Sequence, residues 1–446
     1  MDSYIRIPWR LERIPSNSYT KKIAFILGLC FFFEWVDNGS ISYFLPVFGA
    51  EFSLTKDVLG VIGTASNIGV MIGTLISGIA SDKVGRKKVI IASMILWGIA
   101  GLAQAFTHTL PALMVTRVVM GLGIGIQLPA TITLVSESIP SRLRAKYVVI
   151  MLAMAPLGST VAGILCYYMI PTVGWRGVAI VEAVPALMAF VIWKLIPESA
   201  LWHEAKGHID EANRIMTEME NKIKAAINQE LPPVTIVEQK GQAKAPAKSN
   251  AKLFSKKFLK TNIMITVWWP ATMIAAYGMS TWFTSIFVDK GISLSSSILY
   301  TSLITLGGVG GVFVLPKLLD VVGRRWSCVI IGLIAACAAF AYGSVEAIVL
   351  LTICGMLFQF GAQGVAQVSV TYASELYPTS IRNTGVGYAQ FIGRLGSVLG
   401  PIILGLVMSR FSISAAVYFA AAMYIIGGAF VLIFGEETKG KVFTDE

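Results

Sequence analysis

Charged residues are scarce in this sequence. Only 14% of the 446 residues are Asp, Glu, Lys or Arg, whereas a soluble protein usually carries about 25%. Histidine and cysteine are also rare, with 3 and 5 residues, and the cysteines lack the spacing of a disulfide framework or a metal site. These shortages exclude a water-soluble enzyme, a secreted disulfide scaffold and a disordered chain. The sequence also lacks a nucleotide-binding loop, which argues against a primary pump.

Long hydrophobic stretches take the place of the missing charge. Hydrophobic residues make up 55% of the chain, and the mean hydropathy is +0.71. Each stretch is close to the ~20 residues that a helix needs to cross ~30 Å of hydrocarbon. The first stretch is too long for the core of a signal peptide, so we interpret it as an uncleaved span. The sequence predicts an all-α integral membrane protein with twelve transmembrane helices, at about 22–45, 57–80, 89–107, 110–135, 146–170, 177–196, 261–286, 296–318, 327–345, 347–373, 385–409 and 414–434.

The positive charges lie mainly at one end of these spans. The N-terminal segment, the even-numbered hairpins, the central loop and the C-terminus hold 30 of the 36 Lys and Arg residues. Positive charge marks the cytoplasmic side, so we expect both termini there, in a multi-pass protein of the plasma membrane. These positive charges orient the chain in a bilayer. The net charge of +11 is explained by that role, without a nucleic-acid partner.

The second half of the chain repeats the first at a single offset of 238 positions. Three separate motifs recur at this offset: residues 82–86 as 320–324, 136–144 as 374–382, and 197–199 as 435–437. Two repeated halves of six spans, with a site between them near the midplane, are typical of secondary transporters. We therefore expect an N-terminal segment (1–21), a six-helix bundle (22–196), a cytoplasmic central loop (197–259), a second six-helix bundle (260–434) and a cytoplasmic tail (435–446). Within the loop the apolar spacing from Leu201 to Ile223 predicts an amphipathic helix, and 241–252 has the composition of a flexible linker.

Five motifs resemble signatures of the major facilitator superfamily. They lie at residues 78–88, 117–125, 197–199, 375–385 and 437–441. The resemblance covers essentially the whole chain and is strongest to the sugar-porter-like branch, which includes organic-ion transporters and aromatic-acid:proton symporters. It implies the major facilitator fold of two six-helix bundles related by a pseudo-two-fold repeat, and transport by alternating access.

The repeated loop motifs supply the predicted gating residues. Gly85 allows a tight turn, while Asp82 and Arg86 can pair with each other and with a helix end. We expect such ion pairs to hold the two halves together at the cytoplasmic side when the site opens outward, and to break when it opens inward. The complete predicted gating set is Gly78, Asp82, Gly85, Arg86, Glu137, Arg144, Asp320, Gly323, Arg324, Glu375 and Arg382.

Four charged residues fall inside predicted spans and break the repeat. They are Glu34 and Asp37 in the first span, Arg117 in the fourth and Arg394 in the eleventh. A charge at a helix centre costs about 2.5–3.5 kcal/mol on insertion scales, and rises of about 1.5 Å per residue place all four in one central layer. Glu34 and Asp37 are three residues apart on one helix face, so one carboxyl is expected to hold a proton. Because no histidine lies in a span, we assign proton coupling to Glu34 and Asp37, tuned by Arg117. The resemblance to aromatic-acid:proton symporters implies the same role for these residues. In that family, however, the first acid is typically Asp, whereas here it is Glu34.

Arg394 is the best candidate for binding a substrate. A guanidinium keeps its charge and grips a carboxylate with two hydrogen bonds. The alternative is that Arg394 only forms an internal salt bridge with the first span. Further polar and aromatic residues could line the same cavity, or simply pack: Gln390, Gln127, Gln359, Gln363, Trp269, Tyr277, Tyr372 and Tyr388.

These residues favour proton-coupled symport of a small organic acid, with an aromatic carboxylate as one candidate. A sugar:proton symporter is a second hypothesis, although residues 263–273 lack the Gln-Gln pair that sugar porters use. An organic-cation transporter, in which the two acids bind the substrate, is a third, and a non-transporting membrane sensor is a fourth. We expect no catalytic residue, no metal and no cofactor other than the coupling proton, and a monomer in the lipid bilayer.

Overall fold

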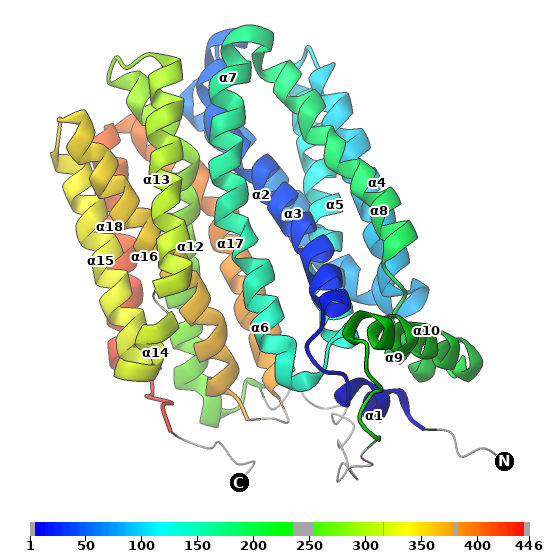
Figure 1. Cartoon of the computed structure of the whole chain (residues 1–446). Helices are drawn as coiled ribbons and strands as arrows, with labels where there is room; N and C mark the ends of the chain where they lie inside the picture. The colour runs from blue at the N-terminus through cyan, green and yellow to red at the C-terminus, as the bar shows by residue number, and fades with distance from the viewer. Residues whose placement is uncertain (1–4, 235–252, 315, 379–380, 441–446) are drawn as a thin grey trace. The chain divides into compact units, whose positions relative to one another are not determined.

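The computed structural model describes residues 5–234, 253–314, 316–378 and 381–440, and all regular elements in these ranges are helices (Figure 1). The predicted linker at 241–252 lies outside the described residues. The membrane helices are α2 (Ser18–Glu51), α3 (Lys56–Val84), α4 (Arg86–Ala105), α5 (Leu110–Ser138), α7 (Met154–Ala183), α8 (Met188–Leu195), α12 (Leu259–Asp289), α13 (Leu294–Val314), α15 (Arg324–Ser344), α16 (Ile348–Leu376), α17 (Arg382–Arg410) and α18 (Ile413–Phe434). The shorter elements are α1 (Ile7–Glu12), α6 (Ser141–Leu152), η1 (Val184–Leu187), α9 (Ala200–Ala205), α10 (Ile209–Ile227), η2 (Lys256–Phe258) and α14 (Pro316–Val322).

Twelve membrane crossings account for these helices. In the described residues, 11 helical stretches are long and apolar enough to span a bilayer, and one of them, Met154–Leu195, has 42 residues. At about 1.5 Å per residue this stretch would be about 63 Å long, twice the thickness of the hydrocarbon core. Gly174 interrupts it with φ 70° and ψ 177°, so the chain turns there and crosses twice. The two crossings correspond to the predicted spans at 146–170 and 177–196.

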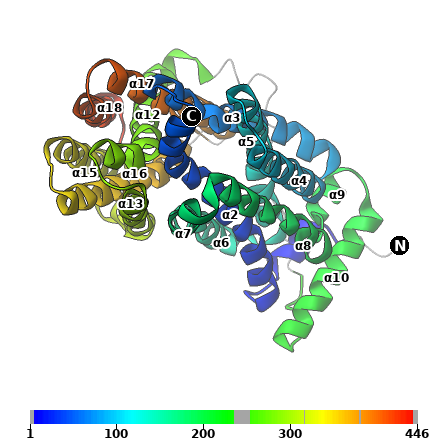
Figure 2. The ribbon, with the colours of Figure 1, turned by 90° about the horizontal axis from the view of Figure 1, so that it is seen from above.

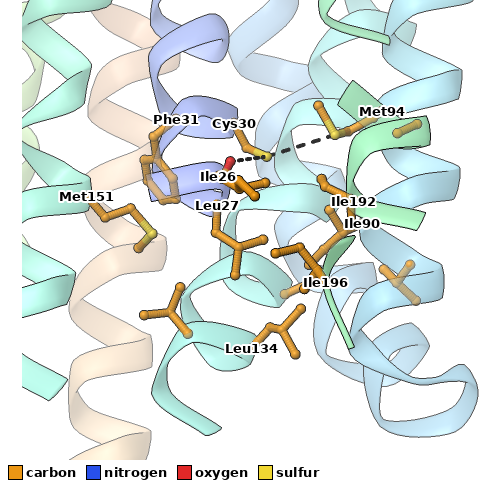
Figure 3. Close-up of a cluster of buried hydrophobic side chains, with 14 of the residues drawn as sticks. Ile26, Leu27, Cys30, Phe31, Ile90, Met94, Leu134, Met151, Ile192 and Ile196 are labelled. Atoms are coloured by element: carbon orange, nitrogen blue, oxygen red, sulfur yellow. Dashed lines mark hydrogen bonds between the residues drawn. The ribbon is translucent and has the colours of Figure 1, made fainter. Parts of the chain in front are cut away.

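The chain forms two compact units, which are described separately. The first contains Met1–Trp35, Ile68–Gly158 and Arg176–Gln242. Its core is a cluster of apolar side chains from α2, α3, α4, α5, α6 and α8, in which Leu27, Ile90 and Leu134 are fully buried (Figure 3). Cys30 belongs to this core, and its Sγ lies 4.0 Å from the Sδ of Met94. The Cys30 side chain therefore packs within the core.

The second unit contains Val36–Asn67, Ser159–Trp175 and Ala243–Glu446. Its membrane helices α12, α13, α15, α16 and α18 are seen nearly end-on as a bundle in Figure 2. Helix α12 packs closely on α17, where glycines allow the backbones to approach. A Cβ added at Gly396 would lie 2.5 Å from the carbonyl oxygen of Pro270, and one at Gly400 would lie 2.6 Å from that of Ile274. Real Cβ contacts essentially never fall below 3.0 Å, so α12 and α17 require glycine at both positions.

Parts of α2, α3 and α7 belong to this second unit, so the compact units do not coincide with the predicted six-helix bundles. The Thr64 hydroxyl donates a 2.6 Å hydrogen bond to the carbonyl of Val398, and the hydroxyls of Ser42 and Thr284 lie 3.2 Å apart. A Cβ at Gly60 would lie 2.7 Å from the carbonyl oxygen of Pro401. These contacts lie at the end of the helices remote from the chain termini, where small residues and hydroxyls let helices from both sequence halves pack together.

An ion pair joins α3 to α12 at the same end of the second unit. The Lys56 ammonium at the start of α3 lies 2.7 Å from the carboxylate of Asp289 at the end of α12. Each side chain keeps 32% of its surface exposed. Pairs this exposed contribute about 0.2–1 kcal/mol, so Lys56 and Asp289 can separate at low cost.

The N-terminal segment is more ordered than its polar sequence suggests. It forms α1, which lies against α9 and α10 (Figure 1). Ile7, Leu11 and Ile14 are buried in a small apolar cluster with the inner face of α10. A helix of six residues is not stable alone, so α1 depends on this docking.

The central loop differs from the predicted single amphipathic helix. Gly207 adopts φ 80° and separates α9 from α10. On α10 the predicted apolar face is confirmed, since Ala212, Ile215, Met219 and Ile223 are buried there. Glu220 is buried on the same face, which the apolar spacing did not predict.

Candidate functional site

Three of the four predicted membrane charges are almost completely buried. Glu34 and Asp37 on α2 keep 4% and 1% of their surface exposed, and Arg117 on α5 keeps 1%. Each of the three has at least one partner in the structure. Glu34 and Arg117 belong to the first unit, whereas Asp37 and Arg394 belong to the second. Burial of ionisable groups within membrane helices is expensive, so their retention points to function.

Arg394 differs from the other three charges. It lies on α17 and is half-buried. Its backbone carbonyl accepts a 2.8 Å hydrogen bond from the Ser397 hydroxyl. Among the described residues of its own unit, no side chain forms an ion pair or hydrogen bond with the Arg394 guanidinium. Its five N–H donors are therefore available to an anionic ligand.

The indole of Trp269 lies beside the backbone that carries Arg394. Trp269 on α12 is 5% exposed, and its ring centroid lies 5.9 Å from that of Trp268. A Cβ added at Gly393 would lie 2.5 Å from Trp269 Cδ1 and 2.6 Å from Nε1. The structure thus brings Trp269 and Arg394, both predicted substrate residues, to adjoining positions at the contact of α12 with α17.

Polar residues on α16 and α12 occupy the same unit. Gln359 is buried, and its side-chain oxygen accepts a 3.3 Å hydrogen bond from the Ser280 hydroxyl. Gln363 and Tyr277 are half-buried, while Gln390 on α17 is exposed. For all four residues, a place in the wall of the substrate site stays a prediction.

Two predicted tyrosines are already engaged by the protein. The Tyr388 hydroxyl lies 2.6 Å from that of Thr266, which joins α17 to α12. Tyr372 is fully buried, and its hydroxyl donates a 2.7 Å hydrogen bond to the carbonyl of Glu436 in the tail. Tyr372 therefore anchors the tail, and the proposed substrate site does not include it.

Gln127 on α5 is completely buried in the first unit. Neither its amide nitrogen nor its amide oxygen has a hydrogen-bond partner among the described residues. The hydroxyl of Thr131, one turn further along α5, is also buried without such a partner. Leaving buried polar atoms unsatisfied costs about 1–3 kcal/mol per group, so Gln127 and Thr131 are candidates for contact with a polar ligand or proton path.

The predicted gating motif of the first half forms a compact network. Gly85 has φ 107° and directly precedes α4, and a Cβ there would lie too close to a carboxylate oxygen of Glu198. The predicted pair of Arg86 with Asp82 is present at 3.1 Å; Arg86 also lies 3.1 Å from Glu137, a pairing that the motif did not predict. The other oxygen of Glu198 accepts a 3.0 Å hydrogen bond from the backbone N–H of Lys87 at the start of α4. A negative charge is favourable at that helix end.

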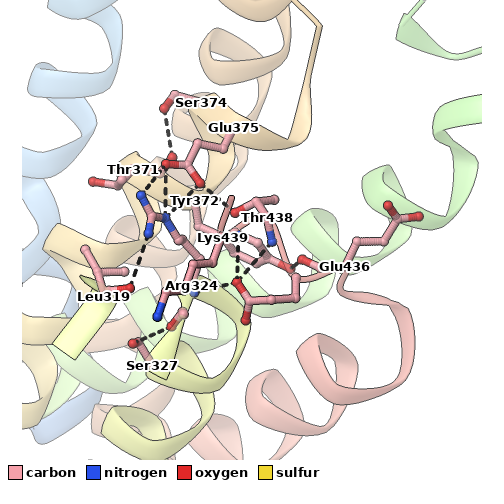
Figure 4. Close-up of polar contacts among 12 residues, drawn as sticks. Leu319, Arg324, Ser327, Thr371, Tyr372, Ser374, Glu375, Glu436, Thr438 and Lys439 are labelled. Atoms are coloured by element: carbon pink, nitrogen blue, oxygen red, sulfur yellow. Dashed lines mark hydrogen bonds and ion pairs between the residues drawn. The ribbon is translucent and has the colours of Figure 1, made fainter. Parts of the chain in front are cut away.

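The repeated motif in the second half forms an equivalent network (Figure 4). Arg324 holds both carboxylate oxygens of Glu375, at 2.9 and 3.1 Å. Gly323 has φ 98° and leaves no room for a Cβ, which would lie 2.5 Å from Glu437. One Glu437 oxygen accepts hydrogen bonds from the backbone N–H groups of Arg324, Thr438 and Lys439 at 2.8–3.0 Å. Burial alone would raise the pKa of Glu437, but these backbone donors outweigh it and hold the pKa below its ordinary value.

This network corrects the register of the sequence repeat. At the offset of 238, Glu198 corresponds to Glu436, but Glu437 makes the equivalent contacts. Asp320 is another difference, because it is exposed and forms no ion pair with the described residues. Arg324 instead pairs with Glu375 and donates a hydrogen bond to the carbonyl of Leu319.

The remaining gating residues have less specific surroundings. Gly78 is exposed and a Cβ there would meet nothing within 4 Å, so no close approach requires glycine at this position. Arg144 is half-buried on α6, and Arg382 at the start of α17 donates a 3.4 Å hydrogen bond to the carbonyl of Tyr377. All the gating ion pairs described above join helices of one and the same unit; a role in holding the two halves together stays a prediction.

A clamp that the sequence did not reveal fixes the N-terminal segment. Glu220 on α10 lies 2.8 Å from Arg10 and 2.7 Å from Arg13. Burial alone would raise the pKa of Glu220, but the hydrogen bonds and charges of the two arginines outweigh it and lower the pKa. Glu12 accepts hydrogen bonds of 2.9 Å from both the backbone N–H and the hydroxyl of Ser141, at the start of α6. The segment therefore ties α10 to the membrane part of the first unit.

Comparison with known proteins identifies relatives along the whole chain. The family model of the Major Facilitator Superfamily matches residues 27–345 and 301–446. The niacin transporter NiaP of Acinetobacter baylyi is 30% identical over 435 residues, covering 97% of each chain. The 4-hydroxybenzoate transporter PcaK of Pseudomonas putida is 27% identical, covering 94% of this chain and 93% of that protein.

Solved structures share the same fold. The crystal structure of a D-xylose-proton symporter superposes with a TM-score of 0.73 at 19% identity, covering 96% of this chain and 100% of that one. A bacterial homologue of the human lysosomal transporter Spinster gives a TM-score of 0.72 at 15% identity, covering 97% and 100%. At these identities the likeness concerns the fold alone.

Proposed function

Because this chain belongs to the Major Facilitator Superfamily and is a multi-pass membrane transporter rather than an enzyme, we propose that it carries a small aromatic carboxylate together with protons. The observation that carries the proposal is Arg394. Arg394 is half-buried on a membrane helix, its guanidinium lacks an ion pair with the described residues of its unit, and the preceding residue, Gly393, lies against the indole of Trp269. A cation carried by a helix backbone that packs against an indole would suit a substrate that joins a carboxylate to a flat ring.

The names of the relatives support this substrate class. Niacin and 4-hydroxybenzoate, the substrates named for two of them, are both aromatic rings with one carboxylate. The sugar hypothesis receives support only from a structural likeness that concerns the fold. An organic cation would place its charge beside Arg394 and be repelled.

Proton coupling is proposed to involve Glu34 and Asp37. Both carboxyls are buried on one membrane helix, three residues apart. Arg117, equally buried, would stabilise the ionised form. Loading a proton from one side of the membrane and releasing it on the other then couples substrate movement to the proton gradient through alternating access.

The remaining features of the proposal follow from charge and from the fold. The excess of Lys and Arg at one end of the spans favours cytoplasmic termini in the plasma membrane. The substrate and protons are the proposed partners, the transporter works as a monomer, and its transport cycle uses no cofactor.

A ligand panel on detergent-purified protein tests the substrate class. Thermal stability is measured with nicotinate and benzoate types of acid, sugars and organic cations at pH 5.5 and 7.5. A ligand at 100 times its Kd adds about 2.7 kcal/mol of apparent stability. We expect stabilisation by aromatic carboxylates that is lost in Arg394→Gln and retained in Arg410→Gln, an exposed arginine at the end of the same helix. Stabilisation by a sugar or a cation that is indifferent to Arg394 would contradict the proposal.

A further inference from the structure

Gly393 differs from the other glycines at the contact of α12 with α17. At Gly396 and Gly400 an added Cβ would meet backbone oxygens, so those glycines bring the two helices together. At Gly393 the nearest three atoms all belong to the side chain of Trp269, at 2.5, 2.6 and 3.2 Å. The edge of the Trp269 indole therefore fills the space that a Cβ at Gly393 would need.

This contact fixes where the indole stands. The edge that carries Cδ1 and Nε1 rests on the α17 backbone, and the ring of Trp268 lies 5.9 Å away at an interplanar angle of 51°. Trp269 is 95% buried, so it has little freedom to move to another rotamer. Arg394 is the next residue on α17, which means that the backbone supporting the indole edge also carries the guanidinium.

We propose that Gly393 is a specificity-determining residue, which sets the distance between the aromatic wall at Trp269 and the carboxylate anchor at Arg394. This inference rests on the function proposed above, because it assumes that Arg394 binds the substrate carboxylate. With the carboxylate held at one end, the position of the indole decides how wide a ring fits beside it.

The size of the effect follows from the space available. A Cβ needs at least 3.0 Å, so Gly393→Ala has to displace the Trp269 edge or move α17. One methylene more or less in an apolar pocket changes substrate discrimination by about 10–200-fold. We therefore expect Gly393→Ala to lower uptake of ring carboxylates relative to a small aliphatic acid by about tenfold or more, mainly through KM.

The test compares matched variants in proteoliposomes. Competition by nicotinate, 4-hydroxybenzoate and propionate for uptake of a labelled aromatic carboxylate is measured for wild type, Gly393→Ala and Gly387→Ala. Gly387 lies on the same helix, and a Cβ there meets nothing within 4 Å, so this control should keep the wild-type preference. The double variant Gly393→Ala with Trp269→Phe should regain ring carboxylates, because the smaller side chain makes room for the added methyl group.

The outcomes separate this inference from the proposed function. If wild type takes up no aromatic carboxylate, the proposed function fails and the inference falls with it. If wild-type uptake depends on Arg394 but Gly393→Ala keeps the same preference, or the double variant gives no recovery, only this inference is overturned. Should Gly393→Ala not yield folded protein, Trp269→Phe alone is expected to shift the preference toward wider rings, and an unchanged preference would overturn the inference.

Discussion

Removing Glu220 should release the N-terminal segment from α10. Its carboxylate accepts hydrogen bonds from Arg10 at 2.8 and 3.2 Å and from Arg13 at 2.7 and 3.3 Å. The side chain of Glu220 is 7% exposed, and those of Arg10 and Arg13 are 12% and 19% exposed. Removing one partner of a buried ion pair costs about 3–5 kcal/mol. Because water reaches both arginines in part, we expect the lower figure of about 3 kcal/mol for Glu220→Ala, which is about a 150-fold increase in undocking.

Hydrogen exchange measures this undocking directly. The amides of residues 7–14 should exchange about 100-fold faster or more in Glu220→Ala, while those in the core of α5 keep their protection. Glu218→Ala is the matched control, since Glu218 lies on the same helix but is 53% exposed and pairs with the exposed Arg214. Unchanged exchange in Glu220→Ala, or equal acceleration in Glu218→Ala, would refute a docking held by the buried carboxylate.

The clamp also predicts a pH dependence. The pKa of Glu220 is lowered in the folded protein, so its stabilising contribution is complete above the ordinary carboxyl pKa. It is lost as the pH falls through the lowered, folded-state value. Docking of residues 7–14 should therefore be constant between about pH 5.5 and 7.5 and weaken only in more acidic solution, which the same exchange experiment would detect.

Further substitutions test the loop motif and the ion pair at the far end of the second unit. Gly85→Ala should lower thermal stability by about 2 kcal/mol or more, because Ala disfavours a positive φ and its Cβ would lie too close to a carboxylate, whereas Gly78→Ala should be neutral; equal effects would contradict this. Lys56→Gln and Asp289→Asn should each speed the labelling of a cysteine introduced at Ser42 by up to about fivefold, corresponding to at most about 1 kcal/mol. The double variant should add nothing, and additive effects would show that the pair does not act as a unit.

The sequence predicted the membrane architecture well because its signals are local. Apolar length located the helices, although the fifth predicted span begins at 146 and α7 only at Met154, and the break at Gly174 restores the twelfth crossing that a 42-residue helix would hide. The pairing of Arg86 with Asp82 was also expected from spacing and repetition, whereas the pairing of Arg86 with Glu137 was not. The repeat misled in one place, since a shift of one residue in the tail gives the contacts expected of Glu436 to Glu437.

The features that escaped sequence reasoning depend on distant contacts. Glu220 lies among apolar residues of an amphipathic helix, and a lone acid there normally faces water; its burial requires α1, whose six residues give no helix signal of their own. The contact of Gly393 with Trp269 joins residues 124 positions apart, so no local pattern reveals it. Similarly, Thr64 binds a carbonyl in the other half of the chain, which places part of α3 in the second compact unit.

Uptake by proteoliposomes tests the central claim most directly. Labelled 4-hydroxybenzoate or nicotinate is supplied to wild type, Arg394→Gln and Arg410→Gln under an inward proton gradient. We expect saturable accumulation that a protonophore abolishes, and a loss of about 30-fold or more in Vmax/KM for Arg394→Gln alone, because truncating one side of a buried charge pair costs about 2–5 kcal/mol. Uptake of the acid that is undiminished in Arg394→Gln, or no uptake of any aromatic carboxylate by the wild type, would contradict the account.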